Sequence, residues 1–313
     1  MMPESIAAER NAIRAELVKL DKQTVWHPYT EMSAYVDRGT PLVVAEARGS
    51  RMLDYSGKSY IDGNASWWTS LLGHGHPRLV KALTRQAECL AHVALADIVH
   101  EPAARLAAEL VEVAPKGLTR VFFSDDGSTA VEVAAKMAFQ YFYQNGQPKR
   151  RRLVALSGAF HGETLLATSM SGVPAFRKPL ENVVIDVLFV PPVASGYDQA
   201  FDELSKLLAQ RGDEVAAVVL EPVLQGASGM RLYDPAFLRH ARQKTQEAGV
   251  MLVADEVFTG YGRTGPMWAC EHAGIVPDIL CTAKGFSGGM LPMAATLVQD
   301  WVFDGFLEDR SRA

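Results

Sequence analysis

Short apolar segments alternate with amphipathic segments along most of the chain after about residue 119. The apolar segments have the length of buried strands: VFFS at 121–124, LVALS at 153–157, VVIDVLFV at 183–190, AAVVLEP at 216–222, VMLVADE at 250–256, DILCTA at 278–283 and MAATLV at 293–298. Between some of them, apolar residues recur at helical spacing, at about 128–144, 198–211 and 234–248. Apolar strands that alternate with helices are typical of a mostly parallel sheet covered on both faces. The pattern therefore predicts an α/β fold.

The beginning of the chain has a different pattern. Short β-like segments are separated by glycine and charged turns, and helical patterns follow: the β-like segments are 42–47 and 51–55, and the helices are at about 78–92 and 101–114. We expect a small N-terminal lobe over residues 1–75 and a large domain over residues 76–313.

Composition narrows the class of protein. A chain of 313 residues with 48% hydrophobic content can bury a large core. The net charge of −5 and the dispersed basic residues argue against nucleic acid as a partner. The three cysteines lie far apart and lack C-x-x-C spacing, which favours a reducing compartment, and no apolar run has the roughly eighteen residues of a membrane span. The sequence thus predicts a cytoplasmic protein without a membrane partner.

Ligands of such sheets bind at the carboxyl ends of the strands, so the polar residues there are candidates for chemistry. Gly127 and Ser128 open a helix after the first strand and could bind a phosphate at its N-terminus, although an ordinary helix cap has the same residues. Phe160 and His161 follow the next strand, where the aromatic ring could stack on a flat ligand.

His161 alone is more typical of a satisfied loop histidine. A metal site is not expected, because His74, His76 and His161 lack the spacing and the carboxylate neighbours of metal ligands.

Ionisable residues end three further strands. Asp255 and Glu221 each follow an apolar run, where a carboxylate needs a cation or a hydrogen-bond donor as partner. Lys284 ends another strand among small residues, where desolvation lowers the pKa of an amine and makes it a nucleophile toward carbonyls. Together with the phosphate and ring sites, these residues match the four functional parts of pyridoxal 5′-phosphate (PLP): phosphate, flat ring, ring nitrogen and aldehyde.

Gly260, Gly262 and Gly265 have the G-x-G-x-x-G spacing of a dinucleotide-binding turn, which raises NAD as an alternative cofactor. Such a turn lies directly between a strand and the helix that it opens. Here the strand ends near Asp255, and the residues from Pro266 onward show no clear helical pattern. We therefore interpret the glycines as a tight loop that passes close to the pocket.

At this point the sequence resembles the class III PLP-dependent aminotransferases, which have the aspartate-aminotransferase fold (fold type I). The matching residues keep the order of that family: Gly127-Ser128 with Ala130 and Glu132, Phe160-His161-Gly162, Glu221-Pro222, Asp255-Glu256, GYGRTG at 260–265, and Lys284 with Gly288-Gly289. Within the family, WHPYTEM at 26–32, Trp67-Trp68 and Arg263 are similar to the transaminases of biotin biosynthesis that transfer an amino group from S-adenosylmethionine to 8-amino-7-oxononanoate.

The resemblance implies a role for each residue. Gly127 and Ser128 would hold the phosphate, Phe160 would stack on the ring with His161 and Glu221 beside it, Asp255 would pair with the ring nitrogen, and Lys284 would bond covalently to the aldehyde. Tyr29, Trp67, Trp68 and Arg263 would bind the substrate. The family also implies a homodimer with the site at the interface.

Two features depart from the family. Asp126 stands where relatives have a small residue, and we expect its carboxylate to turn away from the phosphate. Relatives also continue beyond the position of Ala313 and there supply a phosphate-contacting threonine and a carboxylate-binding arginine, which this sequence does not assign. Alternative interpretations are a transaminase that uses an ω-amino acid or lysine as donor, and a non-catalytic fragment of the fold.

Overall fold

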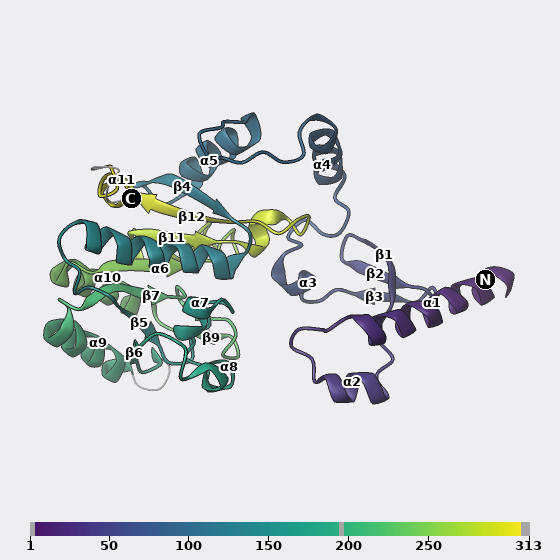
Figure 1. Ribbon diagram of the computed structural model, residues 1–313, viewed down its shortest axis with the longest axis horizontal. Helices are drawn as coiled ribbons and strands as arrows, with labels where there is room; N and C mark the ends of the chain where they lie inside the picture. The colour runs from purple at the N-terminus through teal and green to yellow at the C-terminus, as the bar shows by residue number, and fades with distance from the viewer. Residues whose placement is uncertain (1–3, 194–196, 308–313) are drawn as a thin grey trace. The chain divides into compact units, whose positions relative to one another are not determined.

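The computed structural model describes residues 4–193 and 197–307, and the chain divides into two compact units, Met1–Ala91 and His92–Ala313 (Figure 1). The sequence places the boundary of the lobe near residue 75. In the structure, the helix α4 (Pro77–Cys89) belongs to the first unit.

The first unit contains a small antiparallel sheet. Its three strands lie in the order β1-β2-β3, and the helices stand before and after them in the chain. The elements are α1 (Glu4–Thr24), α2 (Met32–Arg38), β1 (Val44–Arg48), β2 (Arg51–Asp54), β3 (Ser59–Ile61), α3 (Ala65–Trp68) and α4. The β-like segments at 42–47 and 51–55 are confirmed as β1 and β2.

The short element α3 is a turn with left-handed backbone angles. All four residues from Ala65 to Trp68 have φ between 48° and 68°, a region that costs a residue with a side chain about 1–2 kcal/mol. Neighbouring contacts hold the turn in place: Asp62 accepts hydrogen bonds from the Ser66 hydroxyl at 2.7 Å and from His74 Nε2 at 2.8 Å. Such strain persists only where the surroundings fix it, and it is concentrated at functional segments.

The second unit is built on a seven-stranded sheet with the order β4-β12-β11-β10-β7-β5-β6. Its strands are β4 (Leu118–Ser124), β5 (Arg152–Leu156), β6 (Val187–Val190), β7 (Val215–Leu220), β10 (Met251–Asp255), β11 (Ile279–Thr282) and β12 (Ala294–Gln299). Neighbours pair in parallel except at β12, which is antiparallel to both β11 and β4. A two-stranded ribbon, β8 (Leu224–Gln225) with β9 (Arg231–Leu232), lies outside this sheet.

Helices cover both faces of the sheet, as Figure 1 shows. The helices of this unit are α5 (Glu101–Val113), α6 (Gly127–Gln144), α7 (Leu165–Ser169), α8 (Pro174–Arg177), α9 (Tyr197–Arg211), α10 (Pro235–Ala248) and α11 (Asp300–Asp304). The predicted helices at about 128–144, 198–211 and 234–248 are confirmed as α6, α9 and α10.

Two large hydrophobic clusters form the core around the sheet, one on each face. Alternate residues of a strand contribute to different clusters: Val218 and Leu252 pack with α9 and α10, whereas Val219 and Val253 pack with α6. Because side chains alternate across a strand, an uninterrupted apolar strand is the pattern that fills both clusters. The predicted mostly parallel sheet with helices on both faces is thereby confirmed.

One part of the predicted strand pattern is wrong. Val183 lies in a turn and Val184 in a bend, residues 185–186 have no regular structure, and β6 begins only at Val187. The Val183 N–H donates to Leu180 O at 2.9 Å, and the Val183 side chain is 61% exposed, so these apolar residues close a turn before the edge strand.

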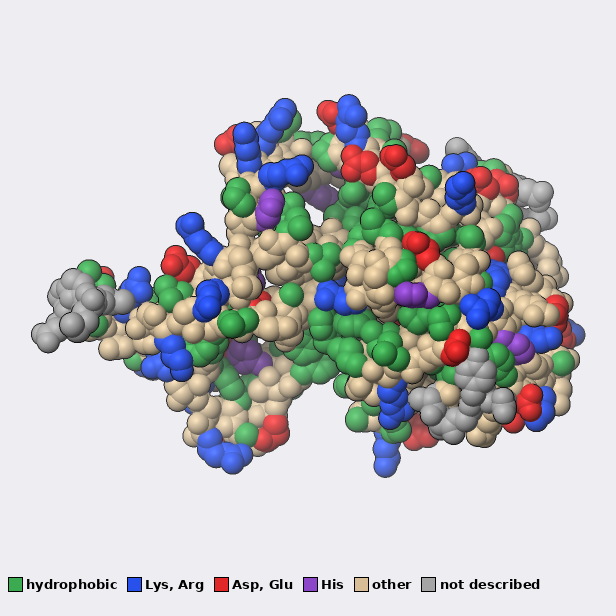
Figure 2. Space-filling model, turned by 180° about the vertical axis from the view of Figure 1, so that it is seen from behind, with side chains coloured by type: hydrophobic (Ala, Val, Ile, Leu, Met, Phe, Trp, Pro, Cys, Tyr) green, Lys and Arg blue, Asp and Glu red, His purple; other side chains and the backbone are tan. Residues whose placement is uncertain are grey.

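The distribution of surface charge and the hydrophobicity of the helices concern the kinds of partner that the chain could bind. On the face of the second unit that Figure 2 shows, Lys and Arg side chains are interspersed with Asp and Glu. Among the residues that the structure describes, no helix has both the length and the apolar character needed to cross a membrane.

Candidate active site

Most of the candidate residues of the second unit converge at one edge of its sheet. β5, β7, β10 and β11 run parallel, and β4 has the same direction because two antiparallel pairings separate it from β11. Their carboxyl ends therefore meet at the same edge. The residues that end or follow these strands are Gly127 and Ser128 after β4, Phe160 and His161 after β5, Glu221 after β7, Asp255 at the end of β10, and Lys284 after β11.

Helix α6 begins at this edge with a side-chain cap. Asp126 is the N-cap: its carboxylate accepts the Thr129 N–H at 2.9 Å, and the Thr129 hydroxyl accepts the Asp126 N–H at 3.0 Å. The carboxylate of Asp126 thus caps the N-terminus of α6. The N–H groups of Gly127 and Ser128 lie in the first turn, where no helical carbonyl precedes them, so they are available to an anion.

Glycines allow three loops to approach one another around Ser128. A Cβ on Gly127 would lie 2.6 Å from Val257 Cγ1, and a Cβ on Gly162 would lie closer still to Ser128. Ser128 Oγ in turn accepts the Glu163 N–H at 3.0 Å. The α6 start, the loop after β5 and the loop after β10 therefore form a tight cradle that larger residues would fill.

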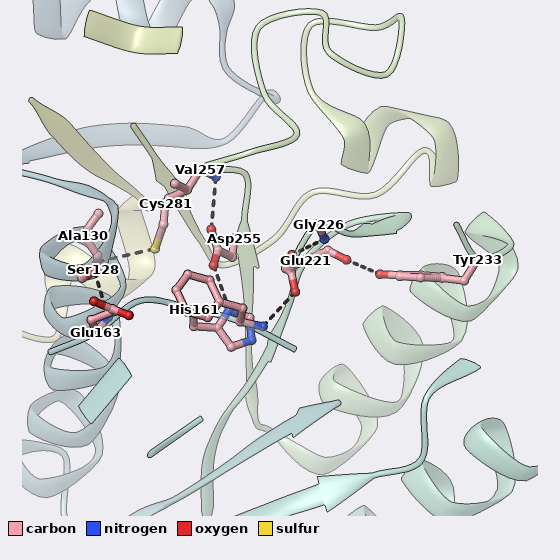
Figure 3. A network of polar contacts seen from close by, with 11 residues as sticks. Ser128, Ala130, His161, Glu163, Glu221, Gly226, Tyr233, Asp255, Val257 and Cys281 are labelled. Atoms are coloured by element: carbon pink, nitrogen blue, oxygen red, sulfur yellow. Dashed lines mark hydrogen bonds and ion pairs between the residues drawn. The ribbon is translucent and has the colours of Figure 1, made fainter. Parts of the chain in front are cut away.

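A buried histidine–aspartate pair lies beside this cradle (Figure 3). His161 Nδ1 and Asp255 Oδ2 are 2.7 Å apart, and Asp255 Oδ1 accepts the Val257 N–H at 3.1 Å. Burial opposes a charge on His161, but the hydrogen bond and charge of Asp255, with the charge of Glu221, outweigh it and raise the pKa of His161. The other ring nitrogen, Nε2, is buried and has no hydrogen-bond partner among the described residues.

Glu221 ties two backbone segments together. One carboxylate oxygen accepts the Phe160 N–H at 3.0 Å, and the other accepts the Gly226 N–H at 2.8 Å (Figure 3). Burial raises the pKa of Glu221 to about 7, the charge of Asp255 adds to the rise, and His161 and the two N–H groups oppose it. Glu221 thus fixes the position of the Phe160 segment.

Lys284 follows β11 in a strained conformation. Its φ is 45°, although it is not glycine. Burial lowers the pKa of its amine, and the charge of Arg263 lowers it further, whereas Asp255 and Glu221 raise it. The net pKa is below that of an ordinary lysine, which increases the fraction of neutral, nucleophilic amine. Backbone strain at a partly buried lysine beside carboxylates indicates a functional residue.

Comparison with known proteins agrees with this geometry. Residues 33–309 match the family described as Aminotransferase class-III. The chain belongs to the class III aminotransferase family. The adenosylmethionine-8-amino-7-oxononanoate aminotransferase of Synechococcus elongatus is 44% identical over 289 residues, which are 90% of this chain and 67% of that protein.

Solved structures of class III transaminases have the same fold. The adenosylmethionine-8-amino-7-oxononanoate aminotransferase of Methanocaldococcus jannaschii superimposes with a TM-score of 0.91 at 34% identity, over 96% of this chain and 69% of that one. A PLP-bound amine transaminase from an uncultivated Pseudomonas species gives 0.85 at 30% identity, over 90% and 66%. Fold type I is therefore confirmed. The chain spans 56–67% of the length of three curated relatives that it matches.

The loop that carries the three glycines of the dinucleotide pattern has another structure in this class III chain. β10 ends at Asp255, and the next helical element is a 3₁₀ turn at Ala269–Ala273, so no α-helix opens at the glycines. A Cβ on Gly260 would lie 2.9 Å from the Trp268 ring, and Gly262 has a φ of 81°. The glycines serve packing and turn geometry, and the family excludes the NAD interpretation.

The aromatic residues expected at the substrate lie together in the first unit. The Tyr29 and Trp67 rings are stacked with centroids 5.4 Å apart, and Trp67 meets Trp68 edge-on at 6.1 Å. Trp67 and Trp68 belong to the left-handed turn, and Tyr29 also has a positive φ of 52°. The structure thus brings these three predicted residues side by side. Tyr29 and Trp67 are each about half exposed.

Three neighbours of the candidate site were given no role from the sequence, although Glu256 is part of the family match. Val257 packs over Gly127, and Phe258 lies beside both Lys284 and Arg263. Glu256 is fully buried and accepts the N–H groups of Ala269 and Cys270 at 3.0 and 2.8 Å, so it organises the loop that bears Arg263. The sequence offers one signal for these three residues: they directly follow Asp255, where the strand ends and the chain turns at the edge of the sheet that carries the site.

The strain at Lys284 predicts a stability difference between two substitutions. Lys284→Gly should be more stable than Lys284→Ala by about 1 kcal/mol, because both remove the amine but only glycine adopts a φ of 45° without strain. Chemical denaturation of both variants measures the difference. The control pair is Lys206→Gly and Lys206→Ala in the interior of α9, where the order should be reversed. Equal stabilities at position 284 would refute the strain.

Glu221 predicts a pH dependence of stability. Its pKa rises from about 4.5 to about 7 on folding, so the folded state binds the proton more tightly. The stability that Glu221 contributes is then full below about pH 4.5 and is lost as the pH rises through about 7. Relative to Glu221→Gln, the free energy of unfolding of the wild type should therefore fall between about pH 5 and about pH 8.

Glu214, just before the start of the same strand, is the matched control. Arg211 and Arg152 lower its pKa, so Glu214→Gln should change stability by a constant amount over that pH range. Denaturation curves at several pH values give both comparisons. A constant difference for Glu221→Gln as well would contradict the raised pKa.

Proposed function

We propose that this chain is a PLP-dependent aminotransferase of biotin biosynthesis that transfers the amino group of S-adenosylmethionine to 8-amino-7-oxononanoate, giving 7,8-diaminononanoate. The observation that carries the proposal is the meeting, at one edge of the sheet, of a buried carboxylate–histidine pair with a strained lysine of lowered pKa. The names of the Synechococcus and Methanocaldococcus relatives support the choice of substrates.

The residues present fit PLP. The first turn of α6 offers the Gly127 and Ser128 N–H groups to the phosphate, and the lack of side chains on Gly127 and Gly162 lets the three loops pack closely around that turn. Phe160, fixed by Glu221, would contact the ring, and the buried carboxylate of Asp255 would pair with the ring nitrogen. Lys284 would hold the aldehyde carbon covalently. When bound, PLP supplies an electron sink for the carbanion that develops at the substrate Cα.

Asp255 and His161 control charge in this site. The carboxylate favours a protonated partner, and His161 holds it in one orientation through the Nδ1 contact at 2.7 Å. The second oxygen of Asp255 is fixed by the Val257 N–H. Both oxygens of the carboxylate are therefore held in place where the ring nitrogen would bind.

Lys284 moves the proton of the reaction. A lowered pKa gives its amine a neutral form that can attack a carbonyl and, once released, can take the proton from the donor Cα as general base. The same Nζ then returns a proton as general acid. Asp255 and Glu221, which raise the pKa, keep the protonated form accessible for that second step.

The substrate contacts are proposed from the resemblance and from side-chain chemistry. Tyr29, Trp67 and Trp68 form an aromatic cluster suited to the methylene chain of the oxo acid. Arg263 supplies a guanidinium for an anionic group of a substrate.

We also propose a cytoplasmic homodimer. The segment 90–99 exposes Leu95, Ile98 and Val99, the last at 84%, which favours a protein partner over this apolar stretch. All three cysteines are free, as in a reducing compartment.

The test is a two-step half-reaction on the purified chain. After incubation with PLP and reduction with borohydride, mass spectrometry should find the cofactor on the Lys284 peptide, and Lys284→Ala should carry none. Addition of S-adenosylmethionine before reduction should then remove the Lys284 adduct by converting the cofactor to its amine form, whereas lysine should leave the adduct in place.

Each result has a defined meaning for the proposal. Loss of the adduct with lysine instead of S-adenosylmethionine would assign a lysine-donor transaminase. No adduct on Lys284 would refute the PLP enzyme and leave a non-catalytic member of the fold.

A further inference from the structure

Phe258 lies next to the two cations of the candidate site. Its ring centroid is 5.9 Å from Lys284 Nζ and 5.6 Å from Arg263 Cζ. Both distances are within the range of cation–π attraction, which extends to about 6 Å from a ring centroid. One aromatic ring therefore contacts both the amine and the guanidinium.

The ring is held in place by its own surroundings. Phe258 packs against a small buried cluster of Val223, Leu224 and Ala269. It also lies close to Gly226, where a Cβ would stand 3.4 Å from two ring atoms. These neighbours belong to the segments that follow β7 and β10, so the ring has packing partners other than the two cations.

The charges around Lys284 indicate what an aromatic ring contributes at this position. Asp255 and Glu221 attract the ammonium group, whereas Arg263 repels it. The repulsion between the two cations favours their separation. The negative face of an aromatic ring attracts both of them and has no charge of its own.

We propose that Phe258 is a positioning residue that holds the Lys284 amine and the Arg263 guanidinium at a fixed spacing on one ring. The inference rests on the proposed function for its consequence: a substrate whose anionic group binds Arg263 would be held at a set distance from the amine that moves its proton. Phe258 would then help to determine which chain length the site accepts.

The test measures the pKa of the Lys284 amine and the reactivity of the Arg263 guanidinium in the chain without PLP. Competitive labelling with acetic anhydride over a range of pH, read by mass spectrometry of the Lys284 peptide, gives the pKa of that amine. Phe258→Leu keeps an apolar side chain but removes the ring, so the ammonium loses an attraction and its pKa should fall by about half a unit. Phe258→Tyr retains the ring and should restore the wild-type value.

A second reagent measures the reactivity of Arg263. Phenylglyoxal modifies guanidinium groups, and Arg263 should react several-fold faster in Phe258→Leu than in the wild type or in Phe258→Tyr. Phe286→Leu is the matched control: the Phe286 ring stacks on Tyr261 at 6.1 Å in the same region, and its loss should change neither readout. If Phe258→Leu does not fold, Phe258→Met replaces it.

The outcomes separate this inference from the proposed function. Wild-type reactivity of Lys284 and Arg263 in Phe258→Leu, or equal changes in the Leu and Tyr variants, would overturn the positioning role. Failure of the wild type to bind PLP on Lys284 would refute the proposed function alone, because the labelling is done without cofactor.

Discussion

The site depends on one interaction, the contact between the buried Asp255 carboxylate and His161. An unpaired carboxylate at the end of a buried strand would cost several kcal/mol, and the histidine at 2.7 Å compensates for that cost without neutralising the site completely. Asp255 in turn influences the pKa of His161, Glu221 and Lys284. Removal of this carboxylate would therefore change the pKa of each of those three groups.

The second constraint is steric and concerns how the backbone brings these charges together. Gly127 and Gly162 have no side chains where Val257 and Ser128 approach, so three loops from separate strands can share one small volume. Strained backbone occurs at residues that keep side chains: at Lys284 in the second unit and, separately, in the turn Ala65–Trp68 of the first. Strain at Lys284 is tolerated because β11 packs in the core.

Much of this arrangement could be predicted from the sequence. The carboxyl ends of parallel strands meet at one edge, so the ionisable residues Asp255, Glu221 and Lys284 could be assigned to one site before any contact was known. The same reasoning failed at residues 183–186, where apolar residues suggested a strand but Val183 lies in a turn and Val184 in a bend. Hydrophobic pattern alone does not distinguish an edge strand from an apolar turn beside it.

Other features required coordinates. The partner of His161 is 94 residues away, and no spacing rule links His161 with Asp255. Phe258 is one apolar residue among many in the sequence, and only its distances to Lys284 and Arg263 mark it. The left-handed turn at Ala65–Trp68 carries no glycine and therefore lacks the usual sequence signal for positive φ.

The most direct test is whether Asp255 keeps the ring nitrogen of bound PLP protonated. Nitrogen-15 NMR of the chain loaded with ring-labelled PLP reports whether that nitrogen carries a proton. We expect a protonated nitrogen in the wild type at about pH 8 and an unprotonated one in Asp255→Asn. An unprotonated nitrogen in the wild type, or the same chemical shift in both proteins, would contradict it.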